Sequence, residues 1–237
     1  MSNCLIIVGS GSYVLSTFMP EKEYEHIYCA DRNEKTVSPS RIWLKYDLEA
    51  MGSNISISTE IHNRYARIDI VFASYLNVGL SSADSPIDIG KGLRGNMAMP
   101  LDLFSRLSRE NPTTEIRGVF ISSMYAHVAP RASNYRDETE MNPLYYGAAK
   151  AGVEQGLKWL SCNNRKHCFN AIALGPTPKP EARLKDPELM DALLSQMPAR
   201  EFIDPEQVST TINYLLGDLS GSLRGRCIHL DGGYTLW

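Results

Sequence analysis

Tyr146 and Lys150 stand four residues apart in the run from Tyr145 to Glu154. If this run is helical, residues i and i+4 share one face, so the phenol and the ammonium group lie side by side. A free tyrosine has a pKa of about 10, and a nearby cation favours the phenolate and lowers that pKa. The pair could then act as a general acid/base on an alcohol or carbonyl oxygen. The competing interpretation is a solvated helix face on which the pair arose by chance.

Composition narrows the class of protein. The chain has 237 residues, of which 43% are hydrophobic and 22% charged, which is ordinary for a globular enzyme. Its net charge is -3 and no basic stripe is visible, so we expect no nucleic-acid binding. The apolar run from Cys4 to Val8 is too short to span a membrane and lacks a basic leader. We therefore expect a cytoplasmic protein with no membrane partner.

The cysteines and histidines favour neither disulfides nor a metal centre. The five cysteines form no C-x-x-C pattern, and three of them lie in apparent strands, which predicts buried thiols in a reducing compartment. The histidines are scattered along the chain, so we expect no metal site. The residues concerned are Cys4, Cys29, Cys162, Cys168 and Cys227, and four of the five histidines, His62, His127, His167 and His229.

Strand-like and helical segments alternate along the chain. Seven strands are expected at 5–8, 27–30, 42–46, 68–73, 118–121, 169–173 and 227–230, and helices at 97–109, 145–161, 187–197 and 205–216. This alternation predicts an α/β fold of the Rossmann type: a doubly wound parallel sheet of about seven strands with helices on both faces. With no linker or repeat, we expect a single domain over 1–237.

The first strand runs into Gly9, Gly11 and Ser12, and we expect a helix to follow this turn. A strand, a glycine turn and a helix make a dinucleotide site, because the backbone can approach the pyrophosphate and the helix N-terminus offers amide groups. Asp31 stands 22 positions after Gly9, where an acid can accept hydrogen bonds from a ribose diol. The alternative is a plain turn with Asp31 as a strand-end cap.

Taken together, these segments resemble the short-chain dehydrogenase/reductase family from end to end. Gly9 and Gly11 correspond to its glycine turn, and Asp47 to the acid that faces the adenine. The residues Asn96, Ser123, Tyr146 and Lys150 match its catalytic Asn-Ser-Tyr-Lys set. The segments Asn170 to Pro176 and Gly225 to Gly233 are similar to its nicotinamide-side loop and its closing Asp-Gly-Gly turn.

The chain also departs from the family pattern. Val8, Tyr13 and Leu15 replace the threonine and two later glycines of the turn, which puts ordinary dinucleotide binding in doubt. The interval of 23 positions between Ser123 and Tyr146 is long and includes the acidic stretch 137–140. That loop resembles the extended, sugar-nucleotide-modifying branch. The chain ends after the Asp-Gly-Gly turn, so we place it in the short branch.

The resemblance implies hydride transfer between a nicotinamide cofactor and a secondary alcohol or ketone, with a sugar-like or biosynthetic intermediate as one candidate. It implies that Tyr146 exchanges the proton, Lys150 lowers its pKa and holds the nicotinamide ribose, and Ser123 steadies the substrate oxygen. Asn96 would hold a water that links Lys150 to solvent. The alternatives are an epimerase or dehydratase with retained NAD and a non-catalytic binding module.

Cofactor choice and substrate contacts are further expectations. Asp31 favours NAD, whereas Arg32 beside it could bind the 2'-phosphate of NADP. Gly175 and Thr177 would touch the nicotinamide side. The segment 177–198 is expected to form a lid over a small-molecule substrate. The family implies a homodimer or homotetramer.

Several residues around Ser123 and Tyr146 remain to be placed. We expect Met124, Tyr125 and His127 to line the substrate pocket. His127 is either a second acid/base or a loop histidine. Tyr145 stands five residues before Lys150, off the shared face, so we assign it to packing or substrate contact.

Overall fold

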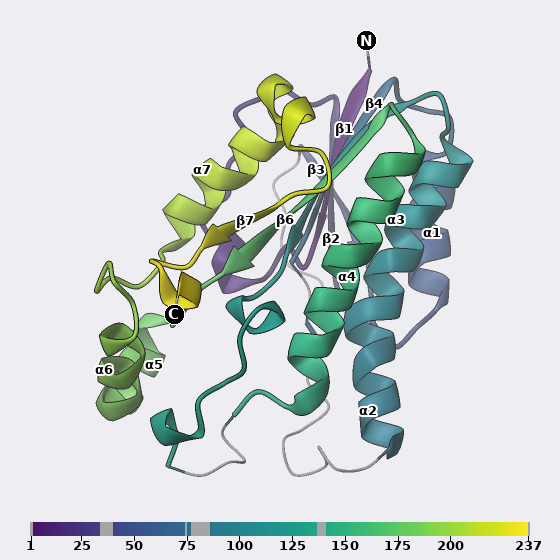
Figure 1. The fold of residues 1–237 in the computed structure, drawn as a ribbon. Helices are drawn as coiled ribbons and strands as arrows, with labels where there is room; N and C mark the ends of the chain where they lie inside the picture. Colours follow the sequence, from purple (N-terminus) through teal and green to yellow (C-terminus); the bar gives the residue numbers. More distant parts are fainter. Residues whose placement is uncertain (1, 34–39, 74, 77–85, 137–140, 237) are drawn as a thin grey trace.

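The computed structural model describes residues 2–33, 40–73, 75–76, 86–136 and 141–236. A single sheet of seven parallel strands, in the order β3-β2-β1-β4-β5-β6-β7, runs through the molecule. Helices lie on both sides of it (Figure 1). The expected α/β fold is confirmed, and all seven expected strands are present.

The strands are β1 (Asn3–Val8), β2 (His26–Asp31), β3 (Arg41–Lys45), β4 (Arg67–Phe72), β5 (Glu115–Ile121), β6 (His167–Leu174) and β7 (Cys227–Leu230). The helices are α1 (Gly52–Ile61), α2 (Pro86–Leu93), α3 (Met99–Glu110), α4 (Leu144–Asn163), α5 (Pro180–Lys185), α6 (Pro187–Ser195) and α7 (Pro205–Leu216).

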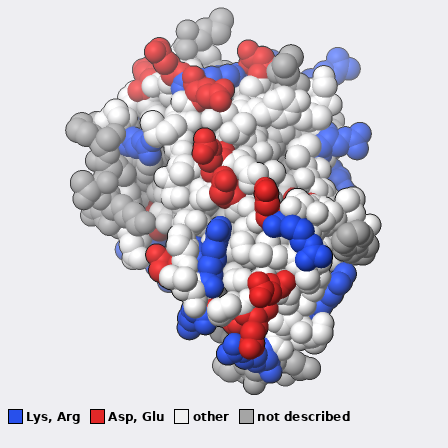
Figure 2. Space-filling model, turned by 90° about the vertical axis from the view of Figure 1, so that its left-hand side faces the viewer, with Lys and Arg blue, Asp and Glu red and all other residues white. Residues whose placement is uncertain are grey.

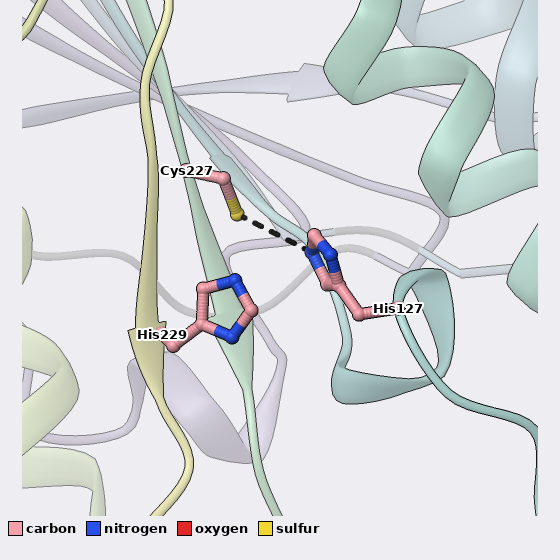
Figure 3. A group of neighbouring side chains, drawn as sticks. All are labelled: His127, Cys227 and His229. Atoms are coloured by element: carbon pink, nitrogen blue, oxygen red, sulfur yellow. Dashed lines mark hydrogen bonds between the residues drawn. The ribbon is translucent and has the colours of Figure 1, made fainter. Parts of the chain in front are cut away.

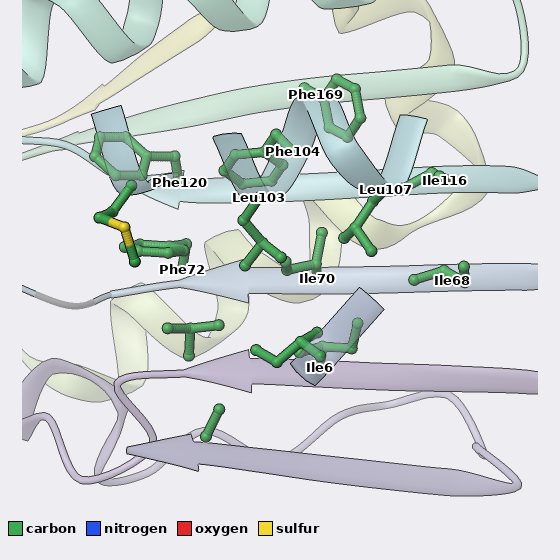
Figure 4. Packing of buried hydrophobic residues seen from close by; sticks show 14 of the residues in the cluster. Ile6, Ile68, Ile70, Phe72, Leu103, Phe104, Leu107, Ile116, Phe120 and Phe169 are labelled. Carbon is green, nitrogen blue, oxygen red and sulfur yellow. The ribbon is translucent and has the colours of Figure 1, made fainter. Parts of the chain in front are cut away.

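Successive side chains of the central strands point to opposite faces of the sheet and pack into two separate apolar cores. On one face, Ile6, Ile70 and Phe72 pack under Leu103 and Phe104 of α3 (Figure 4). The other face packs against α7 and α6. Each fully buried aliphatic or aromatic side chain contributes about 1.5–3 kcal/mol, so the two cores fix the strand ends that carry the polar residues.

The prediction of a helix after the first glycine turn is wrong. Only a 3₁₀ helix, Tyr13–Leu15, lies between β1 and β2, and Leu15 and Phe18 bury themselves in the core shared with α7. Pro20 explains the difference, because it has no N–H to donate and disfavours the helical conformation at Met19. A short loop therefore covers the sheet where a helix was expected.

Elsewhere the expected helices are found, and others were missed. Helix α3 is preceded by α2 and a π-helical turn, Arg94–Ala98, whereas the sequence predicted only 97–109. Helices α1 and α5 were not predicted. The acidic stretch 137–140 and Trp237 lie outside the described residues.

Basic and acidic side chains are interspersed on the face turned to the viewer in Figure 2. Among the described residues on that face no basic stripe is seen, in keeping with the net charge of -3. Within the described parts of the chain, every helix is too short or too polar to cross a bilayer.

Candidate functional site

The carboxyl ends of the central strands open into a cleft of about 380 Å³. Parallel strands place their carboxyl ends at one edge of the sheet, which is where open α/β folds bind ligands. The cleft is lined by Ser12, Val14, Ala73, Tyr75, Ile121, Ser122, Ser123, Met124, Tyr125, Tyr135, Asn142, Tyr146, Lys150, Leu174, Gly175, Pro176, Thr177, Pro178 and Leu193.

Ser123 and Tyr146 are brought together in this cleft. Ser123 follows β5 and caps the 3₁₀ helix Met124–Ala126, where its Oγ accepts a hydrogen bond from the Tyr125 N–H at 3.2 Å. Tyr146 lies in the first turn of α4. Pro143 disfavours a helical residue before it, so α4 begins here. A side-chain hydrogen bond joins the two hydroxyls, as the expected catalytic pair requires.

The pKa of Tyr146 differs from the expectation. Burial raises it, and the hydrogen bond from Ser123 opposes that rise. The predicted lowering of this pKa by Lys150 is wrong for the arrangement seen here, because burial is the larger effect and Ser123 is the group that opposes it. The Lys150 Nζ lies 5.7 Å from the centre of the Tyr146 ring. Tyr146 is consequently a protonated phenol, poised as a proton donor.

Lys150 is 4% exposed and sits one helical turn beyond Tyr146. Its Nζ donates to the Ile121 carbonyl at 2.8 Å and lies 4.5 Å from the centre of the Phe120 ring. Burial lowers the pKa of Lys150 to about 7, and the charge of Glu154 partly opposes this. Lys150 can therefore exchange a proton near neutral pH.

Asn96 lies in the π-helical turn and is buried. Its side-chain amide accepts from the Leu76 N–H at 2.8 Å and donates to the carbonyls of Leu76 and Gly92 at 2.8 and 3.0 Å. These bonds fasten the segment after β4 to the helix. The water-holding role of Asn96 remains a prediction.

Predicted cofactor residues gather at the ends of β1 and β2. Gly9 has a φ of 78°, a conformation that favours glycine, so a tight turn follows β1. The Gly11 N–H donates to Asp31 Oδ2 at 2.8 Å, and the Arg32 N–H donates to Asp31 Oδ1 at 2.7 Å. Asp31 thus caps the strand end and closes the turn, as the plain-turn alternative expects, and its hydrogen bonds to a ribose diol remain a prediction.

Arg32 turns toward acidic neighbours. Its guanidinium lies 3.5 Å from Asp47 Oδ1 and 3.2 Å from Glu49 Oε2. Asp47 in turn accepts from the Glu49 N–H at 2.9 Å. Both predicted residues therefore lie beside the end of β2, and the charge of Arg32 is already balanced.

The residues predicted to contact the nicotinamide follow β6, which lies three strands from β1 in the sheet. Thr177 Oγ1 donates to the Gly175 carbonyl at 3.1 Å, and Ser12 lines the same cleft. A Cβ on Gly175 would lie 2.6 Å from Asp231 Cα, so only glycine fits beside the Asp-Gly-Gly turn. Met124 and Tyr125 also line the cleft, as predicted.

His127 is placed differently from its neighbours. It lines an adjoining hollow that shares Tyr125, Asn142 and Tyr146 with the cleft. Its Nε2 lies 3.1 Å from Glu154 Oε2. Its role as a second acid/base stays a prediction, and unchanged turnover in His127→Ala would end it.

Sequence reasoning missed Glu154 and Tyr75. The buried Glu154 carboxylate accepts a hydrogen bond from Ser122 and faces His127. Its position four residues after Lys150 could have revealed it, since the two share a helix face. Tyr75 packs edge to face against Tyr146, with ring centres 4.9 Å apart. No pattern in the sequence predicts that contact.

Tyr145 packs inside the protein, which is one of the two roles expected for it. It is 1% exposed, and a Cβ on Gly92 would lie 2.5 Å from its ring. It also forms a side-chain hydrogen bond with Tyr75. Tyr145 therefore supports the cleft from behind.

The residues of the cleft fit the nicotinamide end of a dinucleotide better than its pyrophosphate. At the catalytic end, Ser123, Tyr146 and Lys150 converge with Gly175 and Thr177 on one cleft. At the β1 end, the helix N-terminus that commonly receives a pyrophosphate is replaced by a loop. Backbone of the glycine turn and the Ser12 side chain remain there to hold it.

A family model described as enoyl-(acyl carrier protein) reductase matches residues 120–235. An uncharacterised oxidoreductase of Mycobacterium tuberculosis is 34% identical over 98 residues, covering 38% of this chain and 36% of that protein. The L-xylulose reductase of Bos taurus is 29% identical over 97 residues, covering 39% and 40%. The chain thus aligns with less than half the length of these relatives.

Solved structures share the whole fold. A 4-hydroxyisoleucine dehydrogenase complexed with NADH is 17% identical, covers 100% of both chains and has a TM-score of 0.83. A gluconate 5-dehydrogenase from Burkholderia cenocepacia, in complex with NADP and tartrate, is 18% identical, with 100% and 97% covered and a TM-score of 0.81. The family match over the half that carries Ser123, Tyr146 and Lys150 agrees with this fold. The chain is therefore similar to the short-chain dehydrogenase/reductase family over residues 120–235 and has the fold of these solved structures throughout.

Proposed function

We propose that this chain is an NAD(P)-dependent oxidoreductase that interconverts a secondary alcohol and a ketone. The observation that carries the proposal is the hydrogen-bonded pair Ser123 and Tyr146, with Lys150 buried behind it, in a cleft at the carboxyl ends of the strands. When bound, a nicotinamide supplies or takes up the hydride. The residues of this chain supply position and the proton.

In ketone reduction, Tyr146 Oη donates its proton to the carbonyl oxygen of the substrate. Ser123 Oγ donates a hydrogen bond to the same oxygen and steadies its developing negative charge. Lys150 exchanges protons near neutral pH and would hold the nicotinamide ribose. In alcohol oxidation the proton returns to Tyr146.

The ends of β1 and β2 favour NAD over NADP. The Asp31 carboxylate would repel a 2'-phosphate, and Arg32 is paired with Asp47 and Glu49. The relatives, which include an L-xylulose reductase and tropinone reductase homologues, support a choice of substrate class. We propose a polyhydroxylated or small cyclic ketone, with 177–198 as a lid, acting in the cytoplasm as a homodimer or homotetramer.

Binding and turnover test this function separately. The purified protein is titrated with NADH and with NADPH while the nicotinamide fluorescence is followed, and then assayed against a panel of sugar-like and cyclic ketones. We expect saturable binding with NADH preferred. Tyr146→Phe should bind NADH as the parent does and lose turnover.

A second candidate function is a non-catalytic binding module. The loop that replaces the helix after β1 favours it, because it removes the usual receiver of a pyrophosphate. Folded protein that binds neither NADH nor NADPH, and from which no cofactor is released on denaturation, would favour this function over the oxidoreductase.

A further inference from the structure

Three side chains that are far apart in the sequence meet at the β7 edge of the sheet. Cys227 and His229 alternate along β7, so their side chains lie on one face of the strand. His127 reaches them from the end of the 3₁₀ helix Met124–Ala126. Figure 3 shows the three side chains turned toward one another. We propose that His127, Cys227 and His229 bind a divalent transition-metal ion of the zinc class.

The distances suit such an ion. All three ligand atoms lie within 4.8 Å of one another, and Cys227 Sγ is 3.8 Å from His127 Nε2. Zinc bonds of about 2.0–2.3 Å at a tetrahedral angle place ligand atoms roughly 3.3–3.8 Å apart. His229 is partly exposed at the sheet edge, so a small side-chain rotation closes the remaining gap.

A hydrogen-bonded relay prepares His229 as a ligand. Its Nδ1 lies 2.8 Å from Thr235 Oγ1, which itself donates to Asp231 Oδ2 at 2.6 Å. The Thr235 oxygen must then accept from Nδ1–H, which leaves the lone pair on Nε2. Metal-binding histidines commonly have this outer partner, because it fixes the tautomer and the ring orientation.

Glu154 supplies a balancing charge. Its buried carboxylate lies 3.1 Å from His127 Nε2 and forms a hydrogen bond with Cys227. Two neutral imidazoles and one thiolate leave a single positive charge on a divalent ion, which this carboxylate offsets. Binding releases the proton of the Cys227 thiol, and neutral His127 binds through Nε2 as the tautomer that carries its proton on Nδ1.

We expected no metal site because the histidines are scattered along the sequence. The fold nevertheless brings His127 and His229 together with Cys227. The cluster includes none of Ser123, Tyr146 or Lys150. The proposal therefore stands or fails independently of the proposed oxidoreductase activity. A mixed imidazole and thiolate set favours Zn²⁺ over Mg²⁺ or Ca²⁺, which prefer oxygen ligands.

Metal titration of the tag-free full chain tests the proposal. Chelator-treated protein is titrated with Co²⁺, whose bond to a thiolate gives a charge-transfer absorption band, and with Zn²⁺ by calorimetry. We expect one equivalent of each ion, and displacement of Co²⁺ by Zn²⁺. Cys227→Ser should abolish the charge-transfer band, and His229→Gln should weaken binding by about tenfold or more.

Matched variants keep the test decisive. Cys162→Ser and His62→Gln alter exposed residues of the same types outside the cluster and should leave binding unchanged. Thr235→Val removes only the relay and should weaken affinity at unchanged stoichiometry, so it serves even if Cys227→Ser fails to fold. Absence of the charge-transfer band in the parent protein, or equal losses in the Cys162 and His62 variants, would overturn the site.

Discussion

Tyr75 packs edge to face against Tyr146, with ring centres 4.9 Å apart and ring planes at 79°. Tyr75 is 40% exposed, so it forms a thin cover between the Tyr146 phenol and solvent. Burial is the cause that raises the pKa of Tyr146. The cover therefore contributes to keeping Tyr146 protonated.

Tyr75→Ala should lower the pKa of Tyr146, because water then reaches the phenol. Reduction needs the protonated phenol, so its rate falls as pH rises through this pKa. We expect that fall to begin at lower pH in Tyr75→Ala, measured as the pH profile of kcat for ketone reduction. Tyr75→Phe keeps the ring and should retain the parent profile. Identical profiles for all three proteins would show that Tyr75 does not shield the phenol.

Ser123→Ala should slow turnover and move the pH profile in the opposite direction. The hydrogen bond from Ser123 lowers the pKa of Tyr146, so its loss raises that pKa further. Alcohol oxidation needs the phenolate, and its rise with pH should shift upward. Loss of a donor to the reacting oxygen typically costs on the order of 10²–10³ in kcat.

Steady-state kinetics in both directions measure the effect of Ser123→Ala, with NADH titration to confirm unchanged binding. Ser56→Ala, an exposed serine on α1, is the control. A loss confined to KM would place Ser123 in substrate binding alone.

Lys150 makes stability depend on pH. Its pKa in the folded protein is about 7, whereas an unfolded lysine has about 10.4. Between pH 7 and about pH 10.4, Lys150 carries a proton in the unfolded chain but not in the folded protein. Its contribution to the free energy of unfolding therefore rises with pH over this range and is most unfavourable below pH 7.

Lys150→Met should remove that dependence. We expect its Tm to exceed that of the parent most at pH 6, with the difference shrinking toward pH 10. Thermal unfolding across this range measures it, and Lys158→Met, on the exposed face of α4, is the control. A constant difference between Lys150→Met and the parent would show that Lys150 is charged in the folded protein.

Patterns in the sequence predicted the strands and the catalytic helix because both depend on local periodicity. The run 145–161 has apolar residues at helical spacing, and α4 indeed covers Leu144–Asn163. The error came after Gly11, where strand and glycines suggested a helix. Pro20 was the available signal, since it limits any helix there to less than two turns beyond Leu15.

Contacts between distant elements could not be predicted. Tyr75 reaches Tyr146 because β4 ends and α4 begins at the same edge of the sheet. His127 follows β5 and meets Cys227 of β7, two strands away in the sheet. Spacing along the chain carries no record of such pairs. Glu154 is the exception, because its helical spacing from Lys150 was visible.

Gly147→Ala should destabilise the protein, because a Cβ there would collide with the Tyr125 backbone oxygen. That oxygen belongs to the 3₁₀ helix that Ser123 caps, so relief of the collision must move either that turn or the start of α4. Overpacking of this kind typically costs about 1–3 kcal/mol, measurable by urea unfolding. Gly90→Ala, in α2 with open space around its Cβ position, should instead stabilise by about 0.5–1 kcal/mol. Equal gains from both substitutions would show that α4 does not approach the Ser123 turn this closely.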